Sequence, residues 1–211
     1  MFYTNIVRYS NYILYRGYDG SGKKVFRKEK FKPKFYVPSK TQTGWHGLDG
    51  TPIGEVEFGS MREARDWLEQ YNDVGGFNIY GATNYIHQYI TQKFPKDIAF
   101  DRDKINVTTI DIETEYEGGF PDPDIADQTV LAITLKNNID GIYYVWGLQD
   151  YDEEAALIKP LKYVKCSNEN ELLARFLEHW KTEQHIPDVI TGWNVRFFDI
   201  PYLVNRINRV L

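Results

Sequence analysis

The chain has 211 residues, of which 42% are hydrophobic and 16% aromatic, and its formal net charge is −5. This apolar content is enough to bury a core, which excludes a disordered chain, and the negative charge argues against a protein that coats duplex DNA by charge alone. The single cysteine, Cys166, excludes an internal disulfide and fits a reducing compartment. No apolar run reaches membrane-spanning length and the N-terminus lacks the layout of a signal peptide, so we expect no membrane partner.

Residues 11–31 are predicted to form a β-hairpin, because NYILYRGY and KKVFRKEKF flank the turn sequence DGSG. The second arm is dense in basic residues with phenylalanines between them, and these basic residues are Lys23, Lys24, Arg27, Lys28, Lys30, Lys32 and Lys34. Such a mixture suits the backbone and bases of a nucleic acid, and we take Lys28 and Lys30 as candidate contacts. A solvated edge strand that uses lysines to prevent aggregation is an alternative that the sequence leaves open.

The remainder of the first 104 residues is predicted to contain two helices. In SMREARDWLEQY, Ser60 and Glu63 have the spacing of a capping box, and apolar residues recur at helical period. A second helix is predicted over NYIHQYITQ, with a short strand near FNIYG before it. The polar connector FPKDIAFDRDK ends at about residue 104, where we place a boundary between domains of residues 1–104 and 105–211.

The second part of the chain is predicted to have an α/β order. INVTTIDIETE, TVLAITLKN and GIYYVWG are typical of successive strands, a helix follows over about 168–183, DVITG is the next strand, and a last helix begins near Asp199. This is the order of a ribonuclease H-like domain, but it stops before such a domain would be complete. We therefore expect a mixed α+β N-terminal domain followed by an incomplete ribonuclease H-like domain.

Two carboxylates in the strand INVTTIDIETE are candidate metal ligands. Asp111 and Glu113 are two residues apart, so their side chains leave the strand on the same face. Hard divalent cations prefer such oxygen ligands, and a carboxylate pair can bridge two ions that act on a phosphodiester. The alternative is a strand end at which both acids reach water. The same spacing recurs at Asp152 and Glu154, in a polar segment where we assign it no function.

A third acid, Asp199, lies where a loop enters the last predicted helix, in GWNVRFFDIPYLVNRI. Asp199 could cap this helix through backbone N–H groups, and the following Pro201 is favoured in a first turn. Capping explains an acid at this position, but it does not explain the aromatic residues just before it. A helix cap and a metal ligand both remain open.

TTIDIETE and GWNVRFFDIPYLVNRI resemble the first and second exonuclease motifs of family B DNA polymerases, which are written D-I-E and N-x-x-x-F-D. The resemblance is strongest to the polymerases of T-even-like bacteriophages, and it covers about residues 58–211. Two further stretches of this chain, GGFPDP and FGSMREARDWLEQY, also resemble segments of those phage polymerases. This resemblance implies the N-terminal part of a phage replicative DNA-directed DNA polymerase, with a metal-dependent 3′→5′ proofreading exonuclease site. It also implies the cytoplasm of an infected bacterial host as the location.

Carried over by position, the resemblance implies a role for each candidate residue. Asp111, Glu113 and Asp199 would hold two Mg²⁺ or Mn²⁺ ions. Phe120, in GGFPDP, would stack on a base of a single-stranded DNA 3′ end, although packing within its Gly/Pro loop is an alternative. Asn194 and Phe198 would line the site and hold the strand.

Two parts of the family pattern have no counterpart in this sequence. One is the third exonuclease motif, a Tyr four residues before an Asp that supplies the fourth metal carboxylate, and the other is the set of polymerase motifs of the palm. We therefore expect a fragment whose partners include the remainder of a polymerase, with weak metal binding and little or no cleavage by itself. Two further hypotheses stay open: a module that binds RNA or single-stranded DNA without catalysis, and a free-standing 3′→5′ exonuclease.

Overall fold

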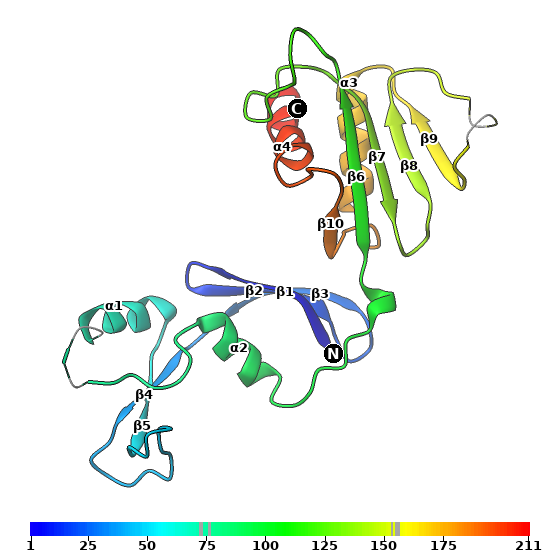
Figure 1. Cartoon of the computed structure of the whole chain (residues 1–211). Coiled ribbons are helices and arrows are strands. Elements are labelled where there is room, and N and C mark those ends of the chain that lie inside the picture. The colour runs from blue at the N-terminus through cyan, green and yellow to red at the C-terminus, as the bar shows by residue number, and fades with distance from the viewer. Residues whose placement is uncertain (72–73, 76, 153, 155–156) are drawn as a thin grey trace. The chain divides into compact units, whose positions relative to one another are not determined.

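The computed structural model describes residues 1–71, 74–75, 77–152, 154 and 157–211 (Figure 1). These residues divide into two compact units, Met1–Phe100 and Asp101–Leu211. Both units combine helices with strands, so the mixed α/β class predicted from the sequence is confirmed. The boundary predicted at residue 104 falls at the end of the 3₁₀ turn η1 (Arg102–Lys104), just beyond this division.

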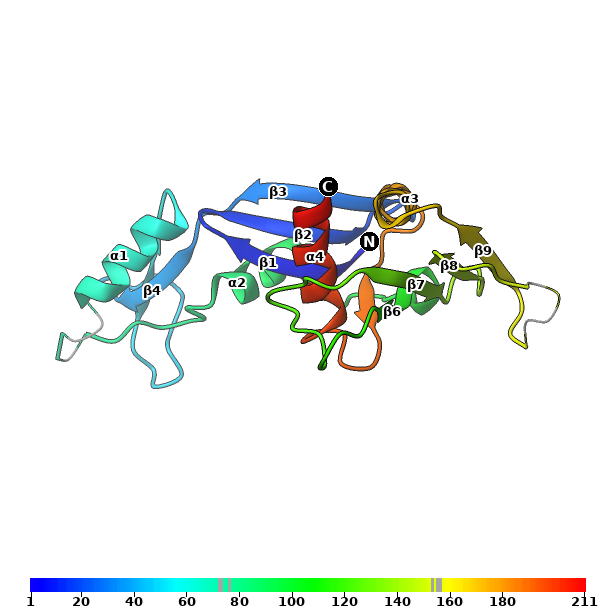
Figure 2. The same cartoon turned by 90° about the horizontal axis from the view of Figure 1, so that it is seen from above.

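The first unit contains, in chain order, β1 (Phe2–Tyr9), β2 (Tyr12–Tyr18), β3 (Lys24–Lys30), β4 (Lys34–Pro38), β5 (Ile53–Glu57), α1 (Met61–Tyr71) and α2 (Tyr85–Lys93). β1, β2 and β3 form an antiparallel sheet with β2 in the middle, which confirms the predicted hairpin (Figure 2). β4 and β5 pair with each other in a separate sheet. The core lies on one face of the β1–β3 sheet, where Ile13 and Tyr15 pack with Phe35, Met61 and Tyr89.

Both predicted helices of this unit are confirmed, and their first turns are capped by side chains. The Ser60 hydroxyl accepts the N–H of Glu63 at 3.2 Å, and the Glu63 carboxylate accepts the N–H of Gly59 at 2.8 Å. The N-cap of α2 is Asn84, whose side chain accepts two backbone N–H groups of the first turn. These contacts satisfy donors that a helix start leaves without an intrahelical partner.

The strand predicted near FNIYG is wrong. Tyr80 forms only an isolated bridge with Tyr36, and no longer ladder is present among the described residues of this segment. The next residue, Gly81, has a φ of 89°, a left-handed conformation that ends an extended run.

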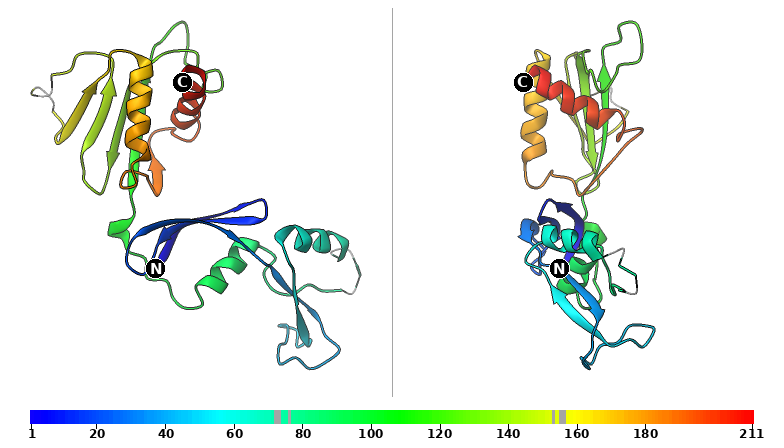
Figure 3. Two further views of the ribbon diagram at one scale, coloured as in Figure 1. Left: turned by 180° about the vertical axis from the view of Figure 1, so that it is seen from behind. Right: turned by 90° about the vertical axis from the view of Figure 1, so that its left-hand side faces the viewer.

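The second unit contains, after η1, β6 (Val107–Thr114), β7 (Val130–Asn137), β8 (Tyr143–Gly147), β9 (Leu161–Lys165), α3 (Glu169–Lys181), β10 (Val189–Thr191) and α4 (Asp199–Val210). The strands form one sheet in the order β10-β6-β7-β8-β9. β6, β7 and β8 are antiparallel neighbours, while β10 is parallel to β6 and β9 is parallel to β8. α3 and α4 lie on the same side of the sheet (Figure 3).

The sequence correctly predicts these helices and strands with the exception of β9. The sequence of β9, LKYVK, is short and has no clear alternation of apolar and polar residues, so it carries little local signal. Its strand conformation depends on parallel pairing with β8, which joins Tyr143 to Leu161 and Val145 to Tyr163. Such a long-range partner is not visible in a local pattern.

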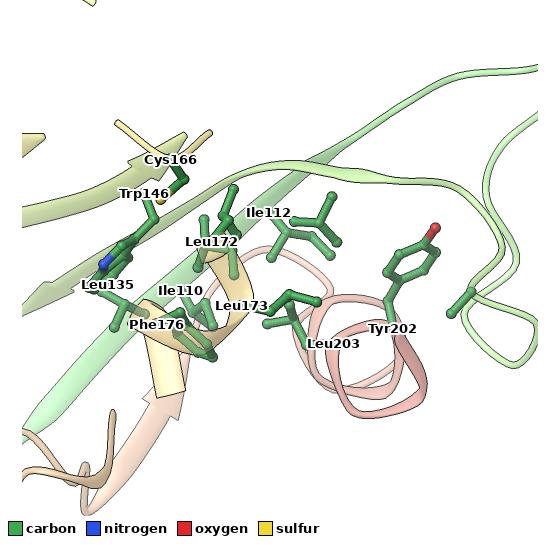
Figure 4. Packing of buried hydrophobic residues seen from close by; sticks show 13 residues of the cluster. Ile110, Ile112, Leu135, Trp146, Cys166, Leu172, Leu173, Phe176, Tyr202 and Leu203 are labelled. Carbon is green, nitrogen blue, oxygen red and sulfur yellow. The ribbon is translucent and has the colours of Figure 1, made fainter. Parts of the chain in front are cut away.

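The core of the second unit lies between the sheet and the two helices. Ile110 and Ile112 of β6 and Leu135 of β7 contact Leu173 of α3 and Leu203 of α4 within one buried cluster (Figure 4). Side chains alternate along a strand, so residues 111 and 113 leave β6 on the opposite face. None of the helices among the described residues has the length and apolar character needed to cross a lipid bilayer.

Candidate active site

Asp111 and Glu113 lie side by side on one face of β6, as their spacing predicts. Both are exposed, whereas Ile110 and Ile112 between and before them are buried in the core. The two carboxylates therefore reach solvent on the sheet face opposite to the one that α3 and α4 cover. A ligand approaching this face would meet both acids together.

Asp199 is the first residue of α4, and its side chain is directed at β6. Phe198 occupies the N-cap position and makes no side-chain capping hydrogen bond. The carboxylate of Asp199 accepts the backbone N–H of Ile112 at 3.2 Å, and the residue is 3% exposed. Asp199 therefore lies one residue after the N-cap position, and its carboxylate is bonded to the neighbouring strand.

The pairing between β10 and β6 ends before the point where the Asp199 side chain reaches β6. β10 pairs with β6 only from Val107 to Thr109, so the ladder on this edge of β6 ends before the acids begin. At Gly192, directly after β10, a Cβ atom would lie 2.5 Å from the carbonyl oxygen of Ile110. Only glycine lets the chain pass β6 this closely before it turns into the loop that leads to α4.

The surroundings of Asp199 disfavour its negative charge. Burial raises the pKa of the Asp199 carboxyl above its ordinary value, and the negative charge of Asp111 raises it further, while backbone N–H groups act in the opposite direction. The bond from Ile112 places the Asp199 carboxylate beside the residue that follows Asp111, which is consistent with this repulsion. A buried carboxylate beside a second one is costly unless a positive charge neutralises the pair.

The three predicted ligands suit a divalent cation in kind, but the described residues do not gather them into a finished site. Carboxylate oxygens are the donors that Mg²⁺ and Mn²⁺ prefer. Within the part of the chain that the structure describes, no three His, Cys, Asp or Glu side chains come close enough together to hold a metal ion. Asp111 and Asp199 interact, and Glu113 shares the face of Asp111 without closing a cluster of three.

Phe120 and Phe198, which come from distant segments, lie against each other. Their ring centroids are 4.8 Å apart with 47° between the ring planes. Phe120 is 77% exposed, so its ring is not simply buried within its own loop. Because Phe198 directly precedes Asp199, this aromatic pair lies next to the buried acid.

Asn194 is exposed and has a φ of 54°, a left-handed conformation that asparagine tolerates better than most residues. Its carbonyl accepts the N–H groups of Phe197 and Phe198, both at 2.9 Å, so it shapes the loop before α4. Contact of its side chain with a nucleic acid stays a prediction. Lys28 and Lys30 belong to β3 of the first unit and are exposed there.

The sheet face that carries Asp111 and Glu113 also has a cavity, which lies over β7, β8 and β9. This cavity, of about 460 Å³, is lined by residues that include Thr134, Tyr143 and Tyr163. Thr134 is the direct partner of Asp111 in the β6–β7 ladder, so the cavity begins one strand away from the acids.

Three residues that the sequence analysis did not single out attach the segment after β6 to the helices. They are Tyr202 and Arg206 of α4 and Glu169 of α3, and the loop lies beside α4 in Figure 1. A signal for Arg206 exists in the sequence, because this charged residue falls on the apolar stripe of its helix with Tyr202 and Leu203. A buried arginine requires a partner.

Residues 79–210 match the family model described as the exonuclease domain of DNA polymerase family B. The chain belongs to the family B DNA polymerases. Among similar proteins, the DNA-directed DNA polymerase of Escherichia phage RB69 is 30% identical across 99% of this chain, and that of Enterobacteria phage T4 is 28% identical across all of it. DNA polymerase beta of African swine fever virus is 28% identical across 47% of the chain.

The comparison confirms the predicted relation to the N-terminal part of T-even-like phage polymerases. The chain spans about a quarter of the length of these phage relatives, 26% of the RB69 enzyme and 25% of the T4 enzyme. The family B match includes β6, the segment with Phe120, and the loop and helix with Asp199.

Proposed function

We propose that this chain is the N-terminal part of a phage replicative DNA-directed DNA polymerase, to which it contributes the metal-dependent 3′→5′ proofreading exonuclease site. One observation carries the proposal: the buried carboxylate of Asp199 is bonded to the backbone of β6 at Ile112, the residue that follows Asp111. Neighbouring carboxylates of which one is buried disfavour the folded state, and such arrangements cluster at functional sites. The match to the family B exonuclease domain supports the same conclusion.

In this proposal Asp111, Glu113 and Asp199 are ligands of Mg²⁺ or Mn²⁺. A pair of such ions, when bound, would supply an activated water and charge stabilisation for the leaving oxygen of a phosphodiester. Asp111 and Glu113 present their carboxylates on the exposed face of the sheet. Asp199 presents its carboxylate at the edge of β6, beyond the residues that pair with β10. The remainder of the polymerase would supply a further carboxylate.

Phe120 and Phe198 would receive the unpaired 3′ end of single-stranded DNA. A flat aromatic surface stacks on any base, which suits an enzyme that removes whichever nucleotide is mispaired. The exposure of Phe120 and its contact with Phe198 beside Asp199 support this role. Asn194, in the loop before α4, would contact the same strand.

We also assign the second unit to an incomplete ribonuclease H-like exonuclease domain and the first unit to the N-terminal domain. The antiparallel series β6–β7–β8 and the parallel placement of β10 beside β6 support this assignment. As part of a phage replicative polymerase, the protein would act in the cytoplasm of the infected bacterium.

A binding and digestion assay with the 211-residue chain tests the proposal. Linear single-stranded DNA with 2-aminopurine at its 3′ end should bind more tightly than a circular strand, Phe120→Ala should weaken this preference, and little cleavage should occur. Equal binding of linear and circular strands would contradict the 3′-end assignment. Fast Mg²⁺-dependent digestion that Asp111→Ala abolishes would contradict the need for a further carboxylate.

A second candidate function is nucleic-acid binding by the open face of the β1–β3 sheet. Tyr12 pairs with Lys30 and Leu14 with Lys28, and paired residues point to the same side of a sheet. This side is opposite to the core face that holds Ile13. The amine of Lys28 lies 4.4 Å from the centre of the Tyr12 ring, so basic and aromatic groups adjoin there. The position of β3 at the sheet edge also fits the alternative of a charged edge strand.

Retention of a single-stranded RNA at several salt concentrations separates these two explanations. Charge reversal in Lys28→Glu and Lys30→Glu should weaken binding and flatten its salt dependence, because phosphate contacts release counterions. Lys96→Glu, which changes an exposed lysine of the same unit, is the matched control. Equal effects of all three variants would leave only the edge-strand role.

A further inference from the structure

The segment between β6 and β7 carries Phe120 and is bonded to α4 through its main chain. The Tyr202 hydroxyl donates to the carbonyl oxygen of Gln128 at 2.6 Å and accepts the N–H of the same residue at 3.1 Å. Asn205 donates from its side-chain amide to the carbonyl oxygen of Pro123 at 2.8 Å. Both contacts fix backbone atoms of the segment, so they do not depend on its side chains.

Arg206 holds the same segment from within the core. Its guanidinium donates to the carbonyl oxygens of Ala126, at 3.1 Å, and Asp127, at 2.8 Å. The rest of the guanidinium forms two parallel hydrogen bonds of 2.7 Å with the carboxylate of Glu169 in α3. Because both charged side chains are about nine-tenths buried, 10% and 12% exposed, this ion pair has a fixed geometry.

These contacts come from a single stripe of α4. Tyr202, Asn205 and Arg206 lie three and four residues apart, so their side chains project from one side of the helix. The same helix begins with Asp199, directly after Phe198, the partner of the Phe120 ring. A single rigid element therefore carries the buried acid and the groups that fix the Phe120 segment.

We propose that Tyr202, Asn205 and Arg206 are positioning residues, which hold the β6–β7 segment so that the Phe120 ring stays against Phe198 beside the acids. The segment has no helix or strand of its own between Glu115 and Thr129, so these bonds take the place of a secondary-structure framework. The consequence for DNA, a preformed aromatic surface for the terminal base, rests on the function proposed above. The positioning itself does not.

Hydrogen exchange of the full 211-residue chain tests the positioning directly. Tyr202→Phe keeps the ring and removes the hydroxyl, and Asn205→Ala removes one amide, so neither variant leaves a charge buried. In both, the amides within residues 121–129, which are those of residue 122 and residues 124–129, should exchange roughly tenfold faster, the scale of a lost buried hydrogen bond, with α3 and β7 unchanged. Asn208→Ala, at an exposed position of α4, should leave all rates as they are. Unchanged exchange of 121–129 in both test variants would overturn the proposal.

Binding of DNA with 2-aminopurine at its 3′ end tests the consequence. Tyr202→Phe and Phe120→Ala should each weaken binding, and the double variant should bind no more weakly than Phe120→Ala alone, because the hydroxyl acts through the ring. Losses that add in the double variant would overturn positioning through Phe120. If the wild-type chain does not bind the strand, the proposed function fails, while the exchange experiment still decides whether these residues hold the segment.

Discussion

At Asp199 a carboxylate is buried at the start of a helix, near the exposed carboxylate of Asp111 and with the N–H of Ile112 as donor. An asparagine could accept the same hydrogen bond without bringing a charge into this place. The retained charge lowers the stability of the folded chain unless a cation compensates it, and such a conflict between stability and local chemistry is typical of a functional site.

The substitution Asp199→Asn should therefore stabilise the protein at neutral pH. Because the folded state raises the pKa of this carboxyl, the penalty is absent where the unfolded chain already binds the proton, and it grows as the pH rises towards and through the folded-state pKa. The variant should gain about 0.5–2 kcal/mol near pH 7 in urea unfolding. The gain should disappear at about pH 3, below the ordinary range of an aspartate. A gain of equal size at both pH values, or a loss near pH 7, would show that the charge is not the cause.

Gly192 determines whether the chain can leave β10 beside the backbone of β6. Gly192→Ala would place a Cβ 2.5 Å from the carbonyl oxygen of Ile110, and a backbone atom cannot swing aside as the end of a flexible side chain can. We expect a loss of about 1–3 kcal/mol, as for other overpacked sites, measured by thermal unfolding. In Gly20→Ala the new Cβ meets nothing within 4 Å, so this control should change stability little.

At the level of elements, α4 joins three parts of the second unit. It contacts the sheet through Leu203, the Phe120 segment through Tyr202, and α3 through the ion pair of Arg206 with Glu169. The ion pair is the part of this arrangement that tolerates least change, because removal of one partner leaves the other charge buried.

Arg206→Ala should accordingly destabilise the protein by about 3–5 kcal/mol. Arg175→Ala removes an arginine from a pair with Glu171 within α3, but its side chain is 51% exposed, and we expect a loss of at most about 1 kcal/mol. Urea unfolding of the two variants under the same conditions provides the comparison. Similar losses in both would mean that the Arg206 pair is not buried as described.

Elements with a strong local signal are predictable from this sequence, and the elements that depend on distant partners are not. Capping spacing and helical period identify α1 and α3, and β-branched runs identify β6 and β7. β9 has no such pattern because its pairing with β8 stabilises it. The segment around Tyr80 shows the opposite error: its apolar run predicts a strand, but within the described residues Tyr80 forms only an isolated bridge and the run has no partner strand.

The candidate site divides in the same way. A period of two places Asp111 and Glu113 on one face of β6, and this is confirmed. The approach of Asp199 to Ile112 and of Phe120 to Phe198 arises from packing between residues far apart in the sequence, and only the family resemblance anticipated it. The bonds that Arg206 makes to main-chain carbonyl groups leave no sequence pattern, apart from a charge on an apolar helix stripe.

For the whole molecule, the net charge of −5 conceals two local surfaces of opposite character. The first unit presents the lysines of β3 next to tyrosines on an open sheet face. The second unit presents exposed carboxylates on β6 and, in the segment that follows β6, the exposed aromatic ring of Phe120. A protein that handles the phosphates of a nucleic acid with lysines, and cleaves them with metal-bound carboxylates, requires both kinds of surface.

The most direct test of the central claim is a titration of the 211-residue chain with Mn²⁺, followed by paramagnetic broadening of its amide NMR signals. We predict weak binding that broadens the signal of Ile112 and its neighbours first, since its N–H lies at the Asp199 carboxylate. Asp111→Asn and Asp199→Asn should each weaken this broadening, whereas Asp152→Asn should not. Broadening centred on Asp152 and Glu154, or broadening near Ile112 that survives both substitutions, would contradict the assignment of a metal site to these acids.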